Sequence, residues 1–201
     1  MNIESVKNIN ITLLFSSPLN HLLISQNDLL NKFKSEDADD NQHSFIDAPG
    51  LKVLVFPKKQ KEIVFEPTRI LLNDKTGIAV ENTEVIDDLQ KILSLEAVEQ
   101  NKLNAYGFNY DAVVVPKENF DFKDFISEKI INIGNLKSAG ISISFEKNGV
   151  LHTVDLKPIN NNKLVAHFNA HINTDKLPDA SKLKTEIHKQ YEEFENIINK
   201  I

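Results

Sequence analysis

The sequence predicts an α+β fold built from two diverged β-α-β(3-4)-α halves, each a curved antiparallel sheet covered by a long helix. The segment 102–115 alternates aromatic and polar residues with period two, as a strand with one packed face does. The segment 178–201 repeats apolar residues every three or four positions, which indicates a helix with one buried stripe. Strands and helices follow one another in the same order before and after residue 100, which indicates an internal duplication.

The two halves are expected at residues 1–100 and 101–201, either as two α+β units or as one continuous domain formed by duplication. An antiparallel sheet of this kind has one apolar face, and a helix must cover that face to remove it from water. The chain of 201 residues is long enough for either arrangement, since it has 41% hydrophobic and 26% charged residues, as ordinary globular proteins do.

Composition and charge exclude several classes of function. The absence of cysteine excludes disulfides and thiolate zinc sites, and it suits a reducing compartment. Glu4 stands where a signal peptide would be basic, and no apolar run approaches the roughly 20 residues of a membrane helix. The net charge of −6 and the single arginine, Arg69, disfavour binding to a phosphate backbone. We therefore expect a cytoplasmic protein whose partner is neither a membrane nor a nucleic acid.

The first half opens with an expected strand over 8–15, which Ser-Ser-Pro ends. A short helix is expected over 26–33, because Ser25 precedes it and an aspartate lies in its first turn. The acidic segment 34–41 is too polar to fold by itself and is interpreted as a loop. It is not interpreted as a calcium site, because the required glycine and final glutamate of an EF-hand loop are missing.

The rest of the first half reads as antiparallel strands followed by a helix. Strands are expected at four places: 51–56, 62–66, 68–72 and 77–81. Turn residues at 57–61 and 74–77 separate them. Asn82 or Thr83 is expected to cap the next helix, whose apolar positions over 85–93 fall on one side.

The second half begins with the strand 102–115, and Pro116 ends it. A helix is expected next, from the Asn119 cap to Gly134-Asn135. Asn148-Gly149 then separates two β-rich runs, as the two central residues of a type I′ hairpin turn would. The resulting register pairs three residues with three others: Phe145 with His152, Ile143 with Val154, and Ile141 with Leu156. A further strand over 164–172 leads to the C-terminal helix.

Catalytic and metal-binding motifs are absent from the sequence. It contains none of the nucleophile-elbow, dinucleotide-binding and zinc-protease motifs G-x-S-x-G, G-x-G-x-x-G and H-E-x-x-H. His167 and His171 are expected on one strand, where four residues span roughly 13 Å, too far to share a metal. They are interpreted as exposed strand histidines. The sequence therefore indicates no catalytic residue, no cofactor and no metal site.

His152 is the one polar residue that the predicted register sends to an apolar face. A buried imidazole needs a hydrogen-bond partner, which Tyr106 or Tyr110 of the central strand could supply. If a cavity remains between helix and sheet, then His152, Tyr106 and Tyr110 are its polar lining and the candidate ligand-binding residues. The alternative is a core histidine whose hydrogen bonds are satisfied within the protein.

Four segments carry a resemblance to a known family: EIVFEPTRILLND, YGFNYDAVV, LVAHFNAHINTD and IHKQYEEF. They resemble a sporadically distributed bacterial family of uncharacterised proteins. That family pairs a G-L-R-Y-type central strand with a C-terminal helix in which His precedes Phe by six residues, here His188 and Phe194. Asn109 stands where the family has an arginine. The resemblance implies a fold and a bacterial origin, and it implies no activity.

Two functions follow as hypotheses. The first is a non-catalytic protein-interaction module, because no catalytic constellation is found; its partner is another protein, and a second copy of the chain is an alternative partner. The second is a small-molecule binder or an enzyme, with a pocket between helix and sheet that His152, Tyr106 and Tyr110 line.

Overall fold

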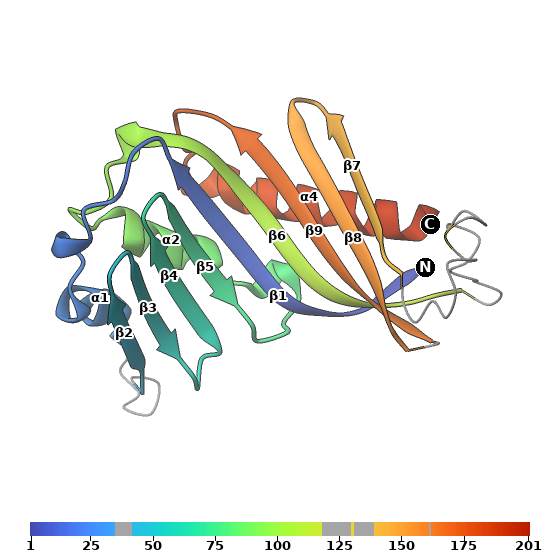
Figure 1. Ribbon diagram of the computed structural model, residues 1–201, viewed down its shortest axis with the longest axis horizontal. Coiled ribbons are helices and arrows are strands. Elements are labelled where there is room, and N and C mark those ends of the chain that lie inside the picture. Colours follow the sequence, from blue (N-terminus) through green and yellow to red (C-terminus); the bar gives the residue numbers. More distant parts are fainter. Residues whose placement is uncertain (35–41, 118–129, 131–138, 161) are drawn as a thin grey trace.

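One antiparallel sheet of nine strands, in the order β2-β3-β4-β5-β1-β6-β9-β8-β7, organises the whole protein (Figure 1). The computed structural model describes residues 1–34, 42–117, 130, 139–160 and 162–201. The strands are β1 (Asn2–Phe15), β2 (Ser44–Ala48), β3 (Leu51–Phe56), β4 (Lys61–Glu66), β5 (Arg69–Asp74), β6 (Leu103–Val115), β7 (Ile141–Lys147), β8 (Val150–Asn160) and β9 (Lys163–Asn173). Every neighbouring pair in the sheet is antiparallel.

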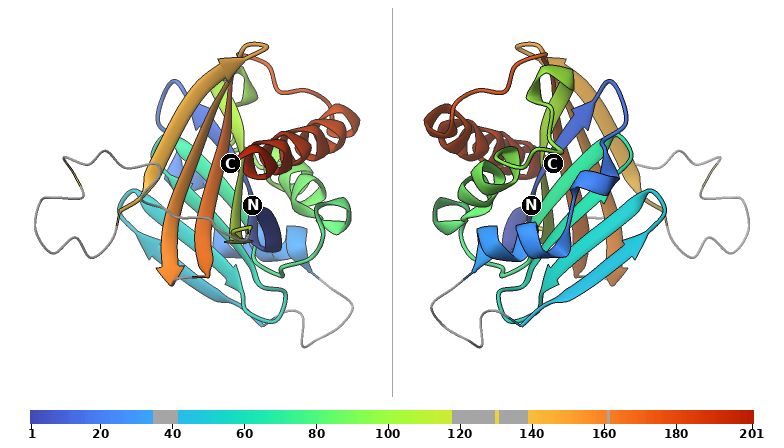
Figure 2. Two further views of the ribbon diagram at one scale, coloured as in Figure 1. Left: turned by 90° about the vertical axis from the view of Figure 1, so that its right-hand side faces the viewer. Right: turned by 90° about the vertical axis from the view of Figure 1, so that its left-hand side faces the viewer.

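In the part of the chain that the structure describes, the helices lie together on one face of this sheet, and none lies on the opposite face, which we call the open face (Figure 2). They are α1 (Gln26–Phe33), α2 (Val85–Leu93) and α4 (Ala180–Lys200), with 3-10 turns at His21–Leu23, Val80–Asn82 and Gln100–Lys102. An ion pair joins α2 to α4, because Lys184 Nζ lies 2.7 Å from Asp87 Oδ1. The fold therefore has two layers, one of strands and one of helices.

The expected fold class, two sheets each covered by its own long helix, is wrong. Strands β1 and β6 pair with each other at the centre, in a register that sets Asn10 opposite Asn109. This pairing joins the strands of residues 1–100 to those of residues 101–201 in one sheet. The physical reason is that each of these long strands would otherwise expose a row of unpaired backbone N–H and C=O groups. The division of the chain at residue 100 stays a prediction.

The hairpin that precedes β9 is confirmed, with the expected register. Phe145 pairs with His152, and the turn residues Asn148 and Gly149 have φ angles of 54° and 76°. Both angles are positive, which a type I′ turn requires and which asparagine and glycine tolerate best. The helix α1 is confirmed with its cap, since the Asp28 backbone N–H donates to Ser25 Oγ at 3.1 Å.

Two elements of the first half differ from the expectation. The segment 77–81, expected as a strand, forms none, and a 3-10 helix begins within it at Val80; the Asp74 carboxylate bonds to residues on both sides of this segment. That carboxylate accepts hydrogen bonds from the Thr76 backbone N–H at 3.1 Å and from Thr83 Oγ1 at 2.7 Å. The edge strand β2 is an additional strand that the sequence did not predict. Residue Glu84 occupies the N-cap of α2 in place of Asn82 or Thr83.

Two expected segments lie outside the described residues. They are the acidic loop, of which residues 35–41 are not described, and the helix from Asn119 to Gly134-Asn135, of which only residue 130 is described.

Aromatic rings fill the space between α4 and the sheet. The Phe194 ring is fully buried, with its centroid 5.1 Å from that of Phe168 on β9 and 6.2 Å from that of Tyr110 on β6. Tyr191 completes this group, with its ring 5.4 Å from that of Tyr110. Ile143 lies on the same face near the β7 edge and is 37% exposed, so the helix does not cover the edge strand fully.

We predict that Phe194→Ala lowers the free energy of unfolding by about 3–5 kcal/mol, because it removes a fully buried ring from this aromatic group. Chemical denaturation measures the change. Glu192→Ala on the exposed side of α4 is the matched control and should change stability by less than about 0.5 kcal/mol. A Phe194→Ala protein that unfolds like the control would contradict the packing of α4 on the sheet.

Candidate functional site

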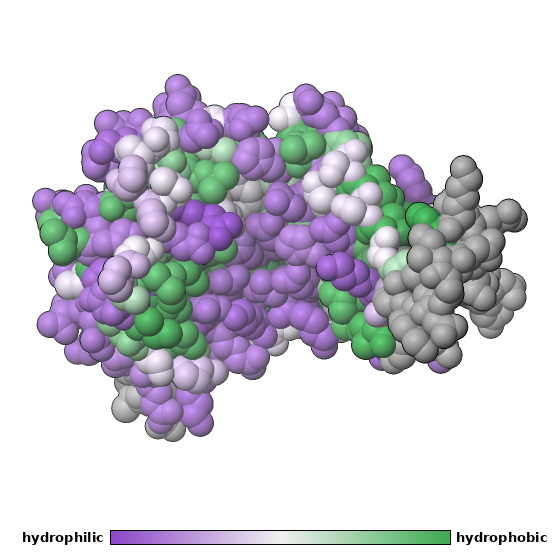
Figure 3. Space-filling view, viewed as in Figure 1, coloured by the Kyte–Doolittle hydropathy of each residue, from purple (hydrophilic) through white to green (hydrophobic). Residues whose placement is uncertain are grey.

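The open face of the sheet carries a row of four asparagines across its four central strands. The register places Asn73, Asn10, Asn109 and Asn169 side by side on β5, β1, β6 and β9. We call these four residues the asparagine row. Figure 3 has the viewpoint of Figure 1, in which the strands lie in front of α4, and it shows a hydrophilic band across the middle of this face. A row of carboxamides at the centre of a sheet is therefore the main chemical feature of the surface.

Three of the four carboxamides of the row are hydrogen-bonded in one direction. Asn109 Nδ2 donates to Asn10 Oδ1 at 2.7 Å, and Asn10 Nδ2 donates to Asn73 Oδ1 at 2.9 Å. Thr12 Oγ1 also donates to Asn10 Oδ1, at 2.7 Å. Because Asn10 is only 4% exposed, these bonds replace the water that its side chain has lost. The chain of amides fixes the side-chain orientations, and each bond polarises the next.

An aspartate and a histidine lie beside the asparagine row. His167 Nδ1 donates to Asp111 Oδ1 at 2.7 Å, and Asn8 Nδ2 donates to Asp111 Oδ2 at 3.0 Å. Burial alone would raise the pKa of Asp111, but the hydrogen bonds from His167 and Asn8 hold that pKa below its ordinary value. The hydrogen bond to Asp111 raises the pKa of His167, against the effect of burial. The two residues thus form an internally neutralised pair.

Gly107 produces a hollow in the open face. On the strands beside it, Thr12 and His171 occupy the paired positions, so the missing side chain leaves a gap between them. A Cβ atom at Gly107 would lie 2.8 Å from the Ala170 backbone oxygen, which is closer than real Cβ contacts. The hollow has a volume of about 360 Å³. We call it the Gly107 hollow. The residues that line it are Asn8, Asn10, Thr12, Leu14, Arg69, Leu71, Asn73, Gly107, Asn109, Asp111, His167, Asn169 and His171.

The remaining charge at the hollow is also paired. Arg69 Nε donates to Glu66 Oε2 at 2.7 Å. This hydrogen bond raises the pKa of Arg69 and lowers the pKa of Glu66. Besides these two ion-paired groups, Asp111 and Arg69, the hollow presents amides, imidazoles and one hydroxyl to a ligand, together with the apolar side chains of Leu14 and Leu71. That set can recognise a molecule by hydrogen bonds rather than by charge.

Two carboxamide oxygens in the lining have no hydrogen-bond donor in the described part of the chain. They are Asn8 Oδ1 and Asn169 Oδ1. A buried acceptor without a donor costs free energy, of the order of 1–3 kcal/mol. Donors supplied by a ligand, with small rotations of these side chains, would recover that cost.

The three residues that the sequence proposed for ligand binding lie on the opposite, helix-covered face. Tyr110 is fully buried, and its hydroxyl donates to the Ile187 backbone oxygen of α4 at 2.5 Å. Burial raises the pKa of Tyr110 well above its ordinary value. Tyr106 is also buried and packs edge-on against Phe108, with ring centroids 5.8 Å apart.

The hydrogen-bond partner of His152 is not one of the expected tyrosines. Its Nε2 lies 2.9 Å from Gln190 Oε1 of α4, and its ring stacks on Phe145 at 5.0 Å. His152 is 2% exposed and lines a cavity of only about 90 Å³, which neither Tyr106 nor Tyr110 lines. Phe168 and Phe194 fill the space near Tyr110. A ligand site shared by the three residues stays a prediction, and the geometry favours the open face.

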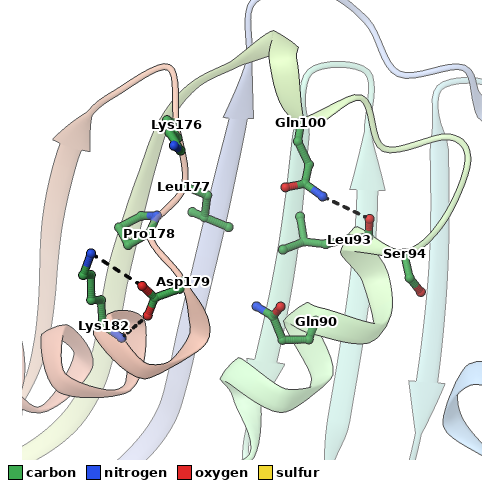
Figure 4. Close-up of a pocket in the computed structure, with 9 residues that line it drawn as sticks. All are labelled: Gln90, Leu93, Ser94, Gln100, Lys176, Leu177, Pro178, Asp179 and Lys182. Atoms are coloured by element: carbon green, nitrogen blue, oxygen red, sulfur yellow. Dashed lines mark hydrogen bonds and ion pairs between the residues drawn. The ribbon is translucent and has the colours of Figure 1, made fainter.

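A larger cavity lies between the C-terminal end of α2 and the N-terminal turn of α4, with a volume of about 880 Å³ (Figure 4). Several of its polar groups have structural partners. Asp179 caps α4 by accepting from the Lys182 backbone N–H at 2.9 Å, and Gln100 Nε2 donates to the Leu93 backbone oxygen at 3.3 Å. This cavity therefore lies at the ends of two helices, whereas the Gly107 hollow lies at the centre of the open face, where two lining oxygens have no donor in the described part of the chain.

Within the described part of the chain, no three or more histidine, aspartate or glutamate residues are grouped closely enough to hold a metal ion. None of the helices found there is both long and apolar enough to cross a membrane. The Asp111 and His167 pair thus lacks the further ligand that a metal site would need.

Sequence reasoning overlooked the open-face residues although their signal was present. Gly107, Asn109 and Asp111 alternate with the aromatic residues of β6, and His167 and His171 alternate with the apolar residues of β9. On each strand taken alone, this alternation is the usual pattern of an antiparallel sheet with one solvated face, so it did not mark a site. The sequence of each strand does not reveal which strands pair, so it could not show that Asn10 and Asn73 lie beside the polar residues of β6 and β9.

Comparisons with protein-family models and with curated proteins found no match for this chain. The resemblance to the bacterial family therefore stays a prediction. Of its signature positions, Phe194 is buried against the sheet, His188 is half-buried on α4, and Asn109 belongs to the asparagine row.

The Asp111 and His167 pair should make stability depend on pH. The raised pKa of His167 gives a stabilising contribution that is complete below its ordinary pKa of 6.5 and is lost as pH rises through the folded value. The lowered pKa of Asp111 gives a contribution that is complete above 3.8 and is lost as pH falls through its folded value. Asp155 and Lys75 add to these two shifts in the same directions.

We predict that His167→Gln reduces the free energy of unfolding more at pH about 5.5 than at pH about 9, because the charged pair exists only in the first condition. Urea denaturation of both proteins at the two pH values measures the difference. An equal loss of stability at both values would show that the charge of His167 contributes nothing to the pair.

We predict that Gly107→Ala destabilises the protein by about 1–3 kcal/mol, because the added methyl group meets the Ala170 backbone oxygen at 2.8 Å. Ser144→Ala, at an exposed position of the same face, is the control and should be close to neutral. Thermal unfolding compares the two variants. A Gly107→Ala protein as stable as the control would mean that β9 can move away from β6 at no cost.

Proposed function

We propose that this protein is a non-catalytic binding module whose recognition site is the Gly107 hollow on the open face of the sheet. The observation that supports the proposal is the hollow itself, where a glycine interrupts the open face of the central strands and polar side chains surround the gap. A concave site with a few placed polar groups and some apolar surface is typical of ligand recognition. On the other face, α4 packs its aromatic residues against the sheet.

The contacts inside the hollow favour binding over catalysis. Thr12 carries the one hydroxyl group of its lining, and this hydroxyl donates to Asn10 rather than to a histidine. His167 is bonded to Asp111, but no nucleophile in the lining is bonded to His167 in turn. An activated nucleophile requires such a base within hydrogen-bond reach. The polar groups of the hollow are therefore arranged to hold a molecule in place.

A partner protein is the second candidate, and a specific observation favours it. Leu151 and Val165 lie on the open face beside the hollow and are 46% and 41% exposed. Exposed apolar residues around a polar centre can contribute to a protein interface. This candidate keeps the function expected from the sequence, including a second copy of the chain as the partner, and moves its surface to the open face. The cytoplasmic location and the bacterial origin also remain proposals from the sequence.

The test compares three forms of the full chain: the unaltered protein, His171→Trp, which fills the edge of the hollow, and Ser144→Trp, which adds the same ring elsewhere on the open face. Each form is equilibrated with a bacterial metabolite extract, and retained compounds are identified by mass spectrometry after ultrafiltration. We expect one class of compound to be retained by the unaltered protein and Ser144→Trp, and to be lost from His171→Trp.

Parallel capture of lysate proteins by the same three forms tests the second candidate. If a protein is retained in a way that depends on His171 and no small molecule is, the open face is a protein-docking surface and the first proposal is wrong. Equal retention of every compound by all three forms would contradict the assignment of the site to the hollow. Circular dichroism of each variant confirms that the comparison is made between folded proteins.

A further inference from the structure

We propose that the Gly107 hollow takes a neutral, hydroxyl-rich molecule, namely a small saccharide or an acyclic polyol. This inference rests on the proposed function and names the chemical class of its ligand. It follows from three properties of the lining: the kind of hydrogen-bonding groups, the pairing of the charges, and the absence of large aromatic rings.

The asparagine row matches hydroxyl groups in its hydrogen-bonding capacity. A carboxamide has donors on its nitrogen and acceptors on its oxygen, whereas a hydroxyl is both a donor and an acceptor at one atom. The bonds from Asn109 to Asn10 and from Asn10 to Asn73 use only part of this capacity. Asn109 Nδ2 also donates to Thr12 Oγ1 at 3.3 Å, and Asn10 is 4% exposed, so the capacity that remains lies at the two ends of the row, Asn73 and Asn169. A ligand with several hydroxyls could bond to these end members, since neighbouring strands are about 4.8 Å apart.

The oxygens without donors indicate that the ligand must donate. Asn8 Oδ1 and Asn169 Oδ1 lie on opposite sides of the lining, on β1 and β9, and no donor in the described part of the chain reaches either. A carboxylate or phosphate ligand has no donor when ionised and would leave both oxygens unpaired. Hydroxyl groups can satisfy them and can accept from neighbouring amides at the same time.

The charges of the hollow indicate that the ligand is neutral. Asp111 is held by His167 and Asn8, and Arg69 is held by Glu66. A charged ligand would either enter without a counter-ion or break one of these pairs, and both cost free energy. The lining thus differs from sites for phosphates or carboxylates, which present a free arginine or lysine.

The apolar part of the lining is aliphatic. Leu14 and Leu71 lie on β1 and β5 beside Thr12, and no phenylalanine, tyrosine or tryptophan lines the hollow. Nucleobases and other flat rings are usually held by stacking on such side chains. Two leucines instead offer a small surface for the C–H groups of a sugar or polyol, while its hydroxyls turn toward the asparagines.

Ligand-observed saturation-transfer NMR on the full chain tests this inference with a defined panel. The panel contains neutral mono- and disaccharides, acyclic polyols, the matching uronic acids and sugar phosphates, and free nucleosides. We expect transfer to neutral sugars or polyols, and affinity for their charged analogues that is weaker by about tenfold or more. Amide resonances of Gly107, Asn109 and Asn169 should shift on addition of the neutral compound.

Two variants locate the binding. Asn169→Leu replaces the carboxamide by an apolar side chain of similar size, and His171→Trp fills the hollow. Both substitutions should abolish the saturation transfer to the ligand. Ser144→Trp should leave that transfer unchanged. Binding that survives both substitutions would overturn the inference, because the sugar would then sit elsewhere.

The result also separates the ligand class from the site. If charged or aromatic metabolites bind in a way that depends on His171 while no neutral sugar or polyol does, the ligand class is wrong and the proposed function stands. If no small molecule of the panel or of the extract binds, both are wrong, and the open face is left to a partner protein.

Discussion

The pairing of β1 with β6 is the interaction on which the rest of the structure depends. Antiparallel hydrogen bonds run along both strands, from the partners Asn2 and Val115 at one end to Phe15 and Leu103 at the other, with three shifts of register. The two strands are 14 and 13 residues long, well above the usual length of about 5–6 residues. Because this ladder is central, it decides which residues of the first half face those of the second.

The same pairing gives the sheet two faces of different chemistry. On one face Ile11, Leu13 and Phe108 are fully buried beneath the helix layer, and this burial provides the main driving force for folding. On the other face the same strands present Asn10, Thr12 and Asn109. These groups would be costly in an apolar layer, but here they bond to one another. The open face is thus stable as a polar surface only because both central strands contribute amides at matching positions.

Buried polar groups on the helix-covered face serve a different purpose. The Tyr110 hydroxyl bonds to the Ile187 backbone oxygen and His152 bonds to Gln190, so each fixes α4 against a particular strand. Both bonds have defined geometry in a packed aromatic group, and they specify the position of the helix more narrowly than apolar contact would. These residues were the candidate ligand site from the sequence. For Tyr110 and His152, partners in α4 use the hydroxyl and Nε2 that a ligand there would contact.

The sequence by itself determined the elements whose causes are local. The Asn148-Gly149 turn fixes its hairpin because positive φ angles are needed at two adjacent residues, and the stripe of α4 follows from its period alone. Only the tertiary structure decided that the halves share one sheet, since period two shows which residues share a face and not which strand lies alongside. The Gly107 hollow depends on this pairing of the two halves. Asn10 and Asn109 are 99 residues apart in the chain, and only long-range strand pairing brings their amides together, two residues along the strands from Gly107.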